Sequence, residues 1–420
     1  MSRTPMTILD AESAEVLQTI WRSLSAVEGG ADMKNGWQLR SLNEACDIIM
    51  GTSPPGDTYN TTGEGVPLIN GPVEFGPGPF GKTVRTKFTT APNKVCKEGD
   101  LILCVRGSTT GKMNVAGFDA CIGRGVAAIR AKEYQPWINY FIRSKRDDIY
   151  SLGTGATFPN ISTAALADLK LLVPPLAEQR RIVGILDEAF EGLATAKANA
   201  EQNLQNARAL FESHLNAVFT QRGDGWVDTR LDEVCGLQNG FAFKSSTFKP
   251  SGSPIIRISN IQDGRIDAEN RLVFFDPKDY RENLDRYRVV EGDLLIAMSG
   301  ATTGKLGFNI DNTVYYLNQR VGKFEPTNRL NKRFLYHFLS TKVEENLRIS
   351  AGAAQPNLST EQIKGFVVPL PGIDEQGRIV DALESISEET QRLESIYQRK
   401  LAALDELKKS LLHQAFSGQL

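Results

Sequence analysis

The chain contains the stretch Leu166-Ala-Asp-Leu-Lys-Leu-Leu-Val-Pro-Pro-Leu-Ala-Glu-Gln-Arg-Arg-Ile182 and repeats it as Ile363-Lys-Gly-Phe-Val-Val-Pro-Leu-Pro-Gly-Ile-Asp-Glu-Gln-Gly-Arg-Ile379. Each copy is a short apolar run, a proline stop, a Glu-Gln pair and then a long helical pattern. Because proline breaks a helix interior but fits at a helix start, these prolines mark where a strand ends and a helix begins. The repeat therefore predicts the same strand-to-helix junction twice.

The spacing between the two copies is constant in one part of the chain and varies in another. The offset is 197 residues from Glu178 and Glu375 to the end of the helical patterns. It is only 189 residues where the stretches that begin at Gly36 and Gly225 match. Insertions therefore fall in the loops of the globular part, whereas the helix length is fixed, which indicates that the helix acts as a ruler.

Apolar residues recur at every third or fourth position in both helical patterns and form a heptad-like seam that includes Leu186 and Leu383. A helix of roughly 40 residues is about 60 Å long, and one apolar seam of that length needs a partner. We expect the two helices to pair as an antiparallel coiled coil about a pseudo-two-fold axis. The alternative is two independent core helices, which the equal lengths argue against.

Short strands, Gly/Pro/Thr-rich loops and one helix precede each long helix, so the fold class is α+β, with two tandem globular domains separated by the long helices. The strands are expected at 101–105, 170–173 and 294–298, and the helices at 137–143 and 334–339. The domain scheme is a leader with a short helix at 1–35, a first domain at 36–174, a central helix at 175–222, a second domain at 223–371 and a C-terminal helix at 372–420.

The composition is that of a globular protein, with 41% hydrophobic and 23% charged residues in a chain of 420. Five cysteines, odd in number and without a CxxC pair, favour reduced thiols and a cytoplasmic location. We find neither a signal peptide nor an apolar run of transmembrane length. The net charge of −2 neither requires nor excludes nucleic acid, so any DNA-binding groups must be gathered on one face.

The stretch Gly107-Ser-Thr-Thr-Gly-Lys112 resembles a phosphate loop but is too short, and Met113 replaces the hydroxyl that would bind Mg²⁺. Its copy ends at Lys305. A tight turn with one lysine can still hold a phosphate of a nucleic-acid backbone, although a plain exposed turn is the alternative. The chain shows no GxSxG, HExxH, Cys/His cluster or methyl-donor site, so the sequence predicts no enzyme, no metal site and no cofactor of its own.

Polar loops in both domains carry donors and acceptors suited to base edges in a major groove. They are 238–246 and Arg257-Ile-Ser-Asn260 in the second domain, with Thr52–Asn60 and Asn70 in comparable places in the first. These residue types are also common turn formers. Their position in diverged loops of a duplicated frame favours DNA reading.

The repeated frame resembles the specificity subunit of type I restriction-modification systems over residues 36 to 420, and the leader lies outside the resemblance. The motifs that carry it are Pro174-Pro-Leu-Ala-Glu-Gln-Arg-Arg-Ile182, Leu370-Pro-Gly-Ile-Asp-Glu-Gln-Gly-Arg-Ile379, Gly99-Asp-Leu-Ile, Gly292-Asp-Leu-Leu-Ile and the two Pro-Asn-Ile/Leu-Ser loops. Gly372 and Asp374 depart from the first copy.

The resemblance implies two target-recognition domains that each read one half of a bipartite DNA site, and a coiled coil that sets the spacer. It implies double-stranded DNA, two methyltransferase (modification) subunits and restriction-translocase subunits as partners, with no membrane. AdoMet, ATP and Mg²⁺ would belong to those partners. The candidate DNA-binding residues are Thr58, Tyr59, Asn70, Arg106, Thr110, Lys112, Thr157, Asn160, Asn239, Lys244, Ser245, Arg257, Ser259, Asn260, Thr303, Lys305, Gln355 and Asn357.

A second hypothesis is a duplicated protein-binding scaffold or adaptor without direct DNA reading. The near-neutral charge favours the scaffold. The paired Thr-Thr-Gly-Lys turns and the resemblance favour the DNA-reading subunit.

Overall fold

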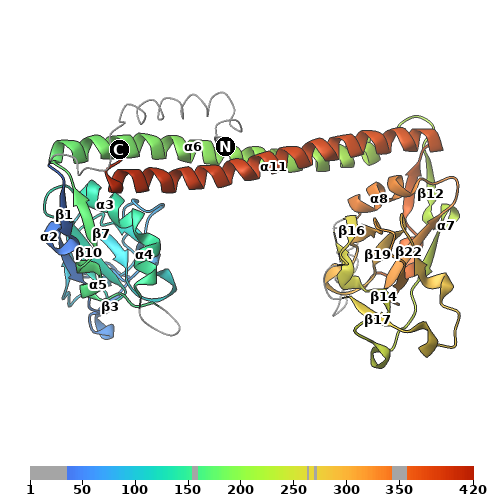
Figure 1. Ribbon diagram of the computed structural model, residues 1–420, viewed down its shortest axis with the longest axis horizontal. Helices are drawn as coiled ribbons and strands as arrows, with labels where there is room; N and C mark the ends of the chain where they lie inside the picture. Colours follow the sequence, from blue (N-terminus) through green and yellow to red (C-terminus); the bar gives the residue numbers. More distant parts are fainter. Residues whose placement is uncertain (1–35, 154–158, 263, 269–271, 343–356) are drawn as a thin grey trace. The chain divides into compact units, whose positions relative to one another are not determined.

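The computed structural model describes residues 36–153, 159–262, 264–268, 272–342 and 357–420 (Figure 1). The short helix that the sequence predicts in the leader lies outside the described residues. The chain divides into two compact units: unit 1 joins the chain up to Gln202 to Ile396–Leu420, and unit 2 is Asn203–Ser395. Each long helix therefore contributes one part to each unit, a division that follows packing and differs from the order of domains along the sequence.

Unit 1 contains one antiparallel sheet of four strands, one mixed sheet of five strands and a two-stranded antiparallel ribbon. Strand β7 is Leu-Ile-Leu-Cys, and its four residues are all buried, as a continuous apolar run predicts for a central strand. The elements are β1 (Gln38–Ser41), α2 (Leu42–Ala45), β2 (Cys46–Met50), β3 (Tyr59–Asn60), β4 (Val66–Ile69), β5 (Phe88–Thr89), β6 (Val95–Cys96), β7 (Leu101–Cys104), β8 (Met113–Val115), β9 (Ala120–Ile122), β10 (Val126–Ala131), α3 (Gln135–Ser144), α4 (Arg146–Ser151), α5 (Thr163–Ala167), β11 (Lys170–Val173) and α6 (Leu176–Thr220).

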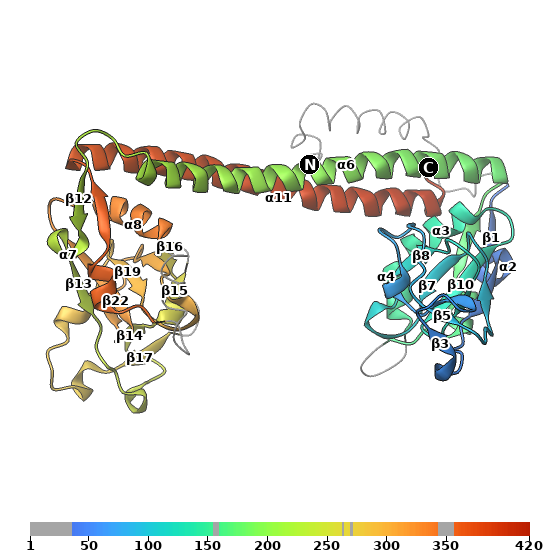
Figure 2. The same cartoon turned by 180° about the vertical axis from the view of Figure 1, so that it is seen from behind.

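The sheets of unit 1 have the orders β2-β10-β7-β8 and β3-β5-β4-β9-β6, and β1 pairs with β11. Within this unit, β3 and β5 lie at the end of the globular domain that is farthest from α6 (Figure 2).

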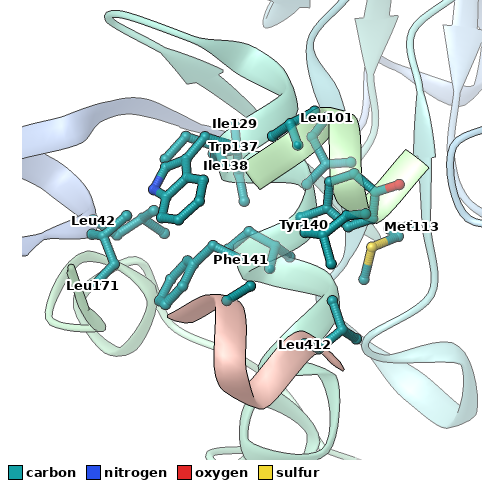
Figure 3. Close-up of a cluster of buried hydrophobic side chains, with 14 of the residues drawn as sticks. Leu42, Leu101, Met113, Ile129, Trp137, Ile138, Tyr140, Phe141, Leu171 and Leu412 are labelled. Carbon is teal, nitrogen blue, oxygen red and sulfur yellow. The ribbon is translucent and has the colours of Figure 1, made fainter. Parts of the chain in front are cut away.

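The core of unit 1 fastens the C-terminal end of the chain to α3 (Figure 3). The ring of Phe416 lies 4.6 Å from that of Trp137 and 5.7 Å from that of Phe141, measured between ring centroids. Leu412 is buried in the same cluster. Burying such side chains contributes roughly 1.5–3 kcal/mol each, so this contact holds the last turns of the chain on the globular domain.

The two long helices, α6 and α11 (Ile373–Ser417), have 45 residues each and run antiparallel within each unit. In unit 1, Lys197 Nζ lies 3.1 Å from a carboxylate oxygen of Asp405. In unit 2, Arg208 Nε lies 3.0 Å from Glu394. The prediction of paired antiparallel helices is confirmed, and two independent core helices are excluded.

The glutamine of the Glu-Gln pair at each helix start stabilises the strand-to-helix junction. The side chain of Gln179 is buried, and its Nε2 donates to the carbonyl of Pro174 at 2.9 Å. Gln376 is buried in the same way and donates to the carbonyl of Pro371 at 2.9 Å. Each glutamine satisfies the carbonyl next to the proline stop, which would otherwise be buried without a donor. The departure at Gly372 is tolerated because α11 begins after it.

Unit 2 repeats this architecture with one extension. Strands β15 and β16 lengthen its first sheet to the order β13-β22-β19-β20-β16-β15, and the second sheet is β17-β14-β21-β18. The elements are β12 (Val227–Arg230), α7 (Leu231–Val234), β13 (Cys235–Asn239), β14 (Ser253–Ile256), β15 (Ile261–Gln262), β16 (Gly264–Ile266), β17 (Val273–Phe275), β18 (Arg288–Val289), β19 (Leu294–Ala297), β20 (Leu306–Phe308), β21 (Tyr315–Leu317), β22 (Val321–Pro326), α8 (Lys332–Thr341), α10 (Thr360–Lys364), β23 (Val367–Leu370) and α11.

Among the described residues, no helix is both long and apolar enough to cross a membrane. The same residues hold no cluster of three or more metal-ligating side chains. The five cysteines are all buried and free. Burial raises the pKa of Cys46 and Cys235 to about 12, so these thiols stay protonated and pack as small apolar groups.

Candidate nucleic-acid interface

The Thr-Thr-Gly-Lys turn has the same construction in both units. Gly107 has φ 81° and Gly300 has φ 78°, a backbone conformation that favours glycine. The hydroxyl of Thr110 donates to the carbonyl of Gly107 at 2.8 Å, and that of Thr303 to the carbonyl of Gly300 at 2.7 Å. The turn leads into a strand, β8 or β20, and not into a helix, so it is not a nucleotide-binding phosphate loop.

The second threonine of each turn, Thr110 or Thr303, is less exposed to solvent than the lysine that follows it. Thr110 and Thr303 are buried, with 3% and 1% of their surface exposed, so they stabilise the turn. Lys112 is exposed, and Lys305 is half-buried with its Nζ 3.3 Å from Oε1 of Gln262. Of the residues predicted in the turn, the lysines are the ones that reach the surface.

In unit 1, three predicted residues gather around one open hollow of about 860 Å³, which we call the recognition hollow. They are Tyr59, Asn70 and Arg106, and Arg124 joins them from the loop between β9 and β10. The full lining is Ser53, Tyr59, Asn70, Arg106, Gly107, Arg124 and Gly125. The hollow thus combines two guanidinium groups, an amide and a phenol, which are donors and acceptors suited to base edges.

Backbone packing explains why Arg124 lies beside Asn70. A Cβ on Gly123 would lie 1.8 Å from Oδ1 of Asn70, and one on Gly125 would lie 2.5 Å from the Asn70 carbonyl. The glycines on both sides of Arg124 therefore allow the close approach. Sequence reasoning missed Arg124, and the Gly-Arg-Gly spacing was the available signal.

Two residues outside the lining hold the loops of the hollow in place, and one of them, Thr58, is a predicted candidate. The carboxylate of Glu74, which is buried, accepts from the backbone N–H groups of Asn70 and Gly71 at 3.1 Å each and fixes the start of that loop. Thr58 is half-buried, and its hydroxyl bonds to the carbonyl of Pro55 and to the hydroxyl of Thr89. Thr58 therefore stabilises the turn before β3, the strand that begins at Tyr59.

The Pro-Asn loops support the same turn in both units. Arg106 forms an isolated antiparallel bridge with Asn160, and Ser299 forms one with Asn357. The predicted residues Thr157 and Gln355, which precede these loops, lie outside the described residues. Asn160 and Asn357 thus belong to the backbone frame, and the residue opposite them differs: an exposed arginine in unit 1 and a buried serine in unit 2.

The reading positions of unit 2 can be matched to those of unit 1 through the strands. Arg257 follows β14 as Asn70 follows β4, and Gln319 follows β21 as Arg124 follows β9. Ile69 pairs with Ile122 in unit 1 and Ile256 with Leu317 in unit 2, which fixes this register. With Ser299 at the position of Arg106, all three reading positions carry a different side chain in the two units.

The other candidates of unit 2 divide between frame and surface. Asn260 is buried; its Oδ1 accepts from the backbone of Arg257, and its Nδ2 donates to the carbonyl of Asp267, so it performs the role of Glu74. Ser259 is half-buried, and its carbonyl accepts from Gln262. Three candidates lie on the surface: Asn239, which bonds to the Thr360 hydroxyl at 2.9 Å, Lys244 and Ser245.

Comparison with known proteins gives one family. The model of the "type I restriction modification DNA specificity domain" matches residues 34–205 and 223–400. The MjaVIII specificity subunit of Methanocaldococcus jannaschii is 25% identical over 362 residues, which cover 80% of this chain and 83% of that protein. The EcoKI specificity subunit of Escherichia coli K12 is 25% identical over 377 residues, 81% of this chain and 80% of that protein.

Two solved structures share the fold. One, described as complex assembly and conformational transition of the type I R-M system, has a TM-score of 0.76 at 20% identity and covers 93% of this chain and 100% of that one. The HsdS subunit of Thermoanaerobacter tengcongensis has a TM-score of 0.62 at 21% identity, with 94% and 100% covered. Because the family model covers most of both units, this chain belongs to the type I restriction-modification DNA specificity family.

Proposed function

We propose that this chain is the DNA-reading subunit of a type I restriction-modification complex and that each unit reads one half of a bipartite, asymmetric site. One observation carries the proposal. The turn, the Pro-Asn bridge and the strand register are shared by the two units, whereas the three reading positions differ in every case. A shared frame positions the protein on a backbone that is the same everywhere, and divergent side chains specify different bases.

The side chains suggest a role for each reading position. Arginine makes bidentate contacts with guanine, and asparagine or glutamine makes them with adenine. In unit 1 we assign Arg106 and Arg124 to guanine and Asn70 to adenine. In unit 2 we assign Arg257 to guanine and Gln319 to adenine. Lys112 and Lys305 contact phosphates, because the same element recurs in two domains that read different bases.

The same proposal assigns the chemistry to other subunits. Two methyltransferase subunits would bind along the helices, and restriction-translocase subunits would complete the enzyme; AdoMet, ATP and Mg²⁺ belong to them. The chain itself transfers no methyl group. Its free, buried cysteines fit a reducing cytoplasm.

The test is an electrophoretic mobility shift with the chain, its methyltransferase partner and duplex DNA. We expect a complex that resists competition by unrelated DNA, and no methyl transfer from labelled AdoMet when the chain is supplied without the partner. A scaffold without DNA reading predicts equal competition by all duplexes. Methyl transfer by the chain without its partner would contradict the non-catalytic role.

A further inference from the structure

Unit 1 contains a second, larger hollow of about 980 Å³, which we call the basic groove. It lies where the α3–α4 corner, the end of the β7–β8 turn and the last turns of α11 meet. Seven lysine and arginine side chains line it, against two carboxylates, those of Asp147 and Asp405. The six that carry the argument are Lys112, Arg143, Lys145, Arg146, Lys408 and Lys409.

Two cations of the groove, Arg143 and Lys408, contact the same aromatic ring, that of Phe190. The guanidinium carbon of Arg143 lies 4.2 Å from the centroid of Phe190 and 5.3 Å from that of Phe80. Lys408 Nζ lies 5.7 Å from the centroid of the same Phe190. Burial lowers the pKa of Lys408, and the positive charge of Arg143 lowers it further; Asp405 raises it, and Lys197 and Arg146 lower it. Such crowding of like charge favours a bound anion.

Part of the charge of the groove is missing from unit 2: Lys305 and Lys342 stand at the positions of Lys112 and Lys145, but three other basic residues have uncharged or acidic counterparts. Helices α3 and α8 match at the constant offset of 197, which places Ser340 at the position of Arg143. The same offset places Phe211 at the position of Lys408 and Glu212 at that of Lys409. A function that both units share, such as docking one of two identical subunits, would not require these charges in one unit alone.

One turn joins the groove to the recognition hollow. Arg106 and Gly107 line the hollow, and Gly111 and Lys112, a few residues further along, line the groove. A ligand that reaches Lys112 from the hollow therefore continues onto a strip of positive charge. The polymer that offers base edges in one place and regularly spaced anions next to it is DNA.

We propose that the basic groove binds the sugar-phosphate backbone next to the half-site that unit 1 reads, independently of base sequence. This inference rests on the proposed function of unit 1. It makes the two units unequal: unit 1 holds its half-site with an additional backbone contact that unit 2 lacks.

The experiment measures affinity against salt concentration for the complete complex with the methyltransferase subunits. The variants are Arg146→Gln and Lys409→Gln, whose side chains are exposed, and the matched control is Lys132→Gln, an exposed lysine of unit 1 that lines neither hollow. Each groove variant should lower the slope of log K against log salt by about one unit, because each phosphate contact contributes about 0.9. The methylated sequence should not change, and the control should keep the wild-type slope.

A second measurement locates the contact. Ethylation of single phosphates should interfere with binding next to the half-site of unit 1, and this interference should disappear in the groove variants while that at the other half-site remains. Wild-type slopes in both variants would overturn the proposal. So would weaker binding of the methyltransferase subunits without DNA, which would mean that the groove holds an acidic protein segment. If the wild-type complex shows no preference for any duplex, the proposed function itself fails, and the two failures are distinguishable.

Discussion

The backbone of Arg106 pairs with that of Asn160, and the N–H of the next residue, Gly107, donates to the carbonyl of Pro159 at 3.1 Å. A residue of the reading surface therefore lies on a strand bridge and not on a free loop. Ser299 and Asn357 form the same bridge in unit 2. The frame tolerates an arginine or a serine at this position, so base preference can change without a change of fold.

Arg124→Gln, which introduces the residue that unit 2 has at this position, should relax one G·C position in one half-site. Loss of a bidentate arginine contact costs about 1–3 kcal/mol of discrimination. The check is binding to a set of duplexes in which each half-site base is changed in turn. Arg124→Lys is the matched control, because it keeps the charge and loses the bidentate geometry. Unchanged discrimination in both variants would remove Arg124 from the reading surface.

Lys112→Ala should weaken binding of specific and non-specific DNA by the same factor and lower the salt slope by about one unit. The reason is that Lys112 follows a turn that recurs in both units, and shared elements position the protein without reading bases. Lys305→Ala should do the same. Anisotropy titrations over a range of salt concentrations measure this, and a changed site preference at undiminished affinity would contradict it.

His337 predicts a pH dependence of stability in unit 2. Its ring is buried, with 5% of its surface exposed, and burial lowers its pKa to about 4, with smaller opposed effects from Glu384 and Arg333. The unfolded chain, with a histidine pKa near 6.5, binds more protons between these values, so the free energy of unfolding falls as pH falls from about 6.5 to 4.

At about 1.4 kcal/mol per pKa unit, the loss through His337 is on the order of 3 kcal/mol. His337→Leu should remove this part of the acid sensitivity. Denaturant unfolding at a series of pH values should therefore show wild type and variant diverging below pH 6.5. Parallel curves would show that His337 does not titrate on unfolding.

The repeat was sufficient to predict the fold class and the long antiparallel helices, because a constant offset of 197 residues can be read without coordinates. The strand-to-helix junction followed from the prolines. The sequence did not reveal that Gln179 and Gln376 cap these junctions from buried positions, since a glutamine in a helix start is usually exposed.

The reading surface was only partly predictable. Two predicted residues, Arg106 and Asn70, do lie together in the recognition hollow. Thr110 and Asn260 are buried and support turns, because threonine and asparagine bond to nearby backbone as readily as to a ligand. Arg124 was missed although the Gly-Arg-Gly spacing marks it, because the sequence does not show that the pairing of β4 with β9 brings it beside Asn70.

The length of α6 and α11 should set the number of unread base pairs between the half-sites. Four residues inserted in each helix, after Asn203 and after Gln398, add about one turn, roughly 6 Å, and keep the seam nearly in phase. At about 3.4 Å per base pair, we expect the same half-sites with a spacer longer by about one or two base pairs. Methylation mapping of the variant measures the spacer, and an unchanged spacer with retained activity would show that the helices are not the ruler.

The central claim is that the two units read their half-sites independently, and replacement of residues 36–165 by another recognition domain tests it most directly. The methylated sites of a host that carries the complex, before and after replacement, give both half-sites and the spacer in one measurement. The account predicts that one half-site changes while the other half-site and the spacer stay the same. A change in both half-sites, or in neither, would contradict it.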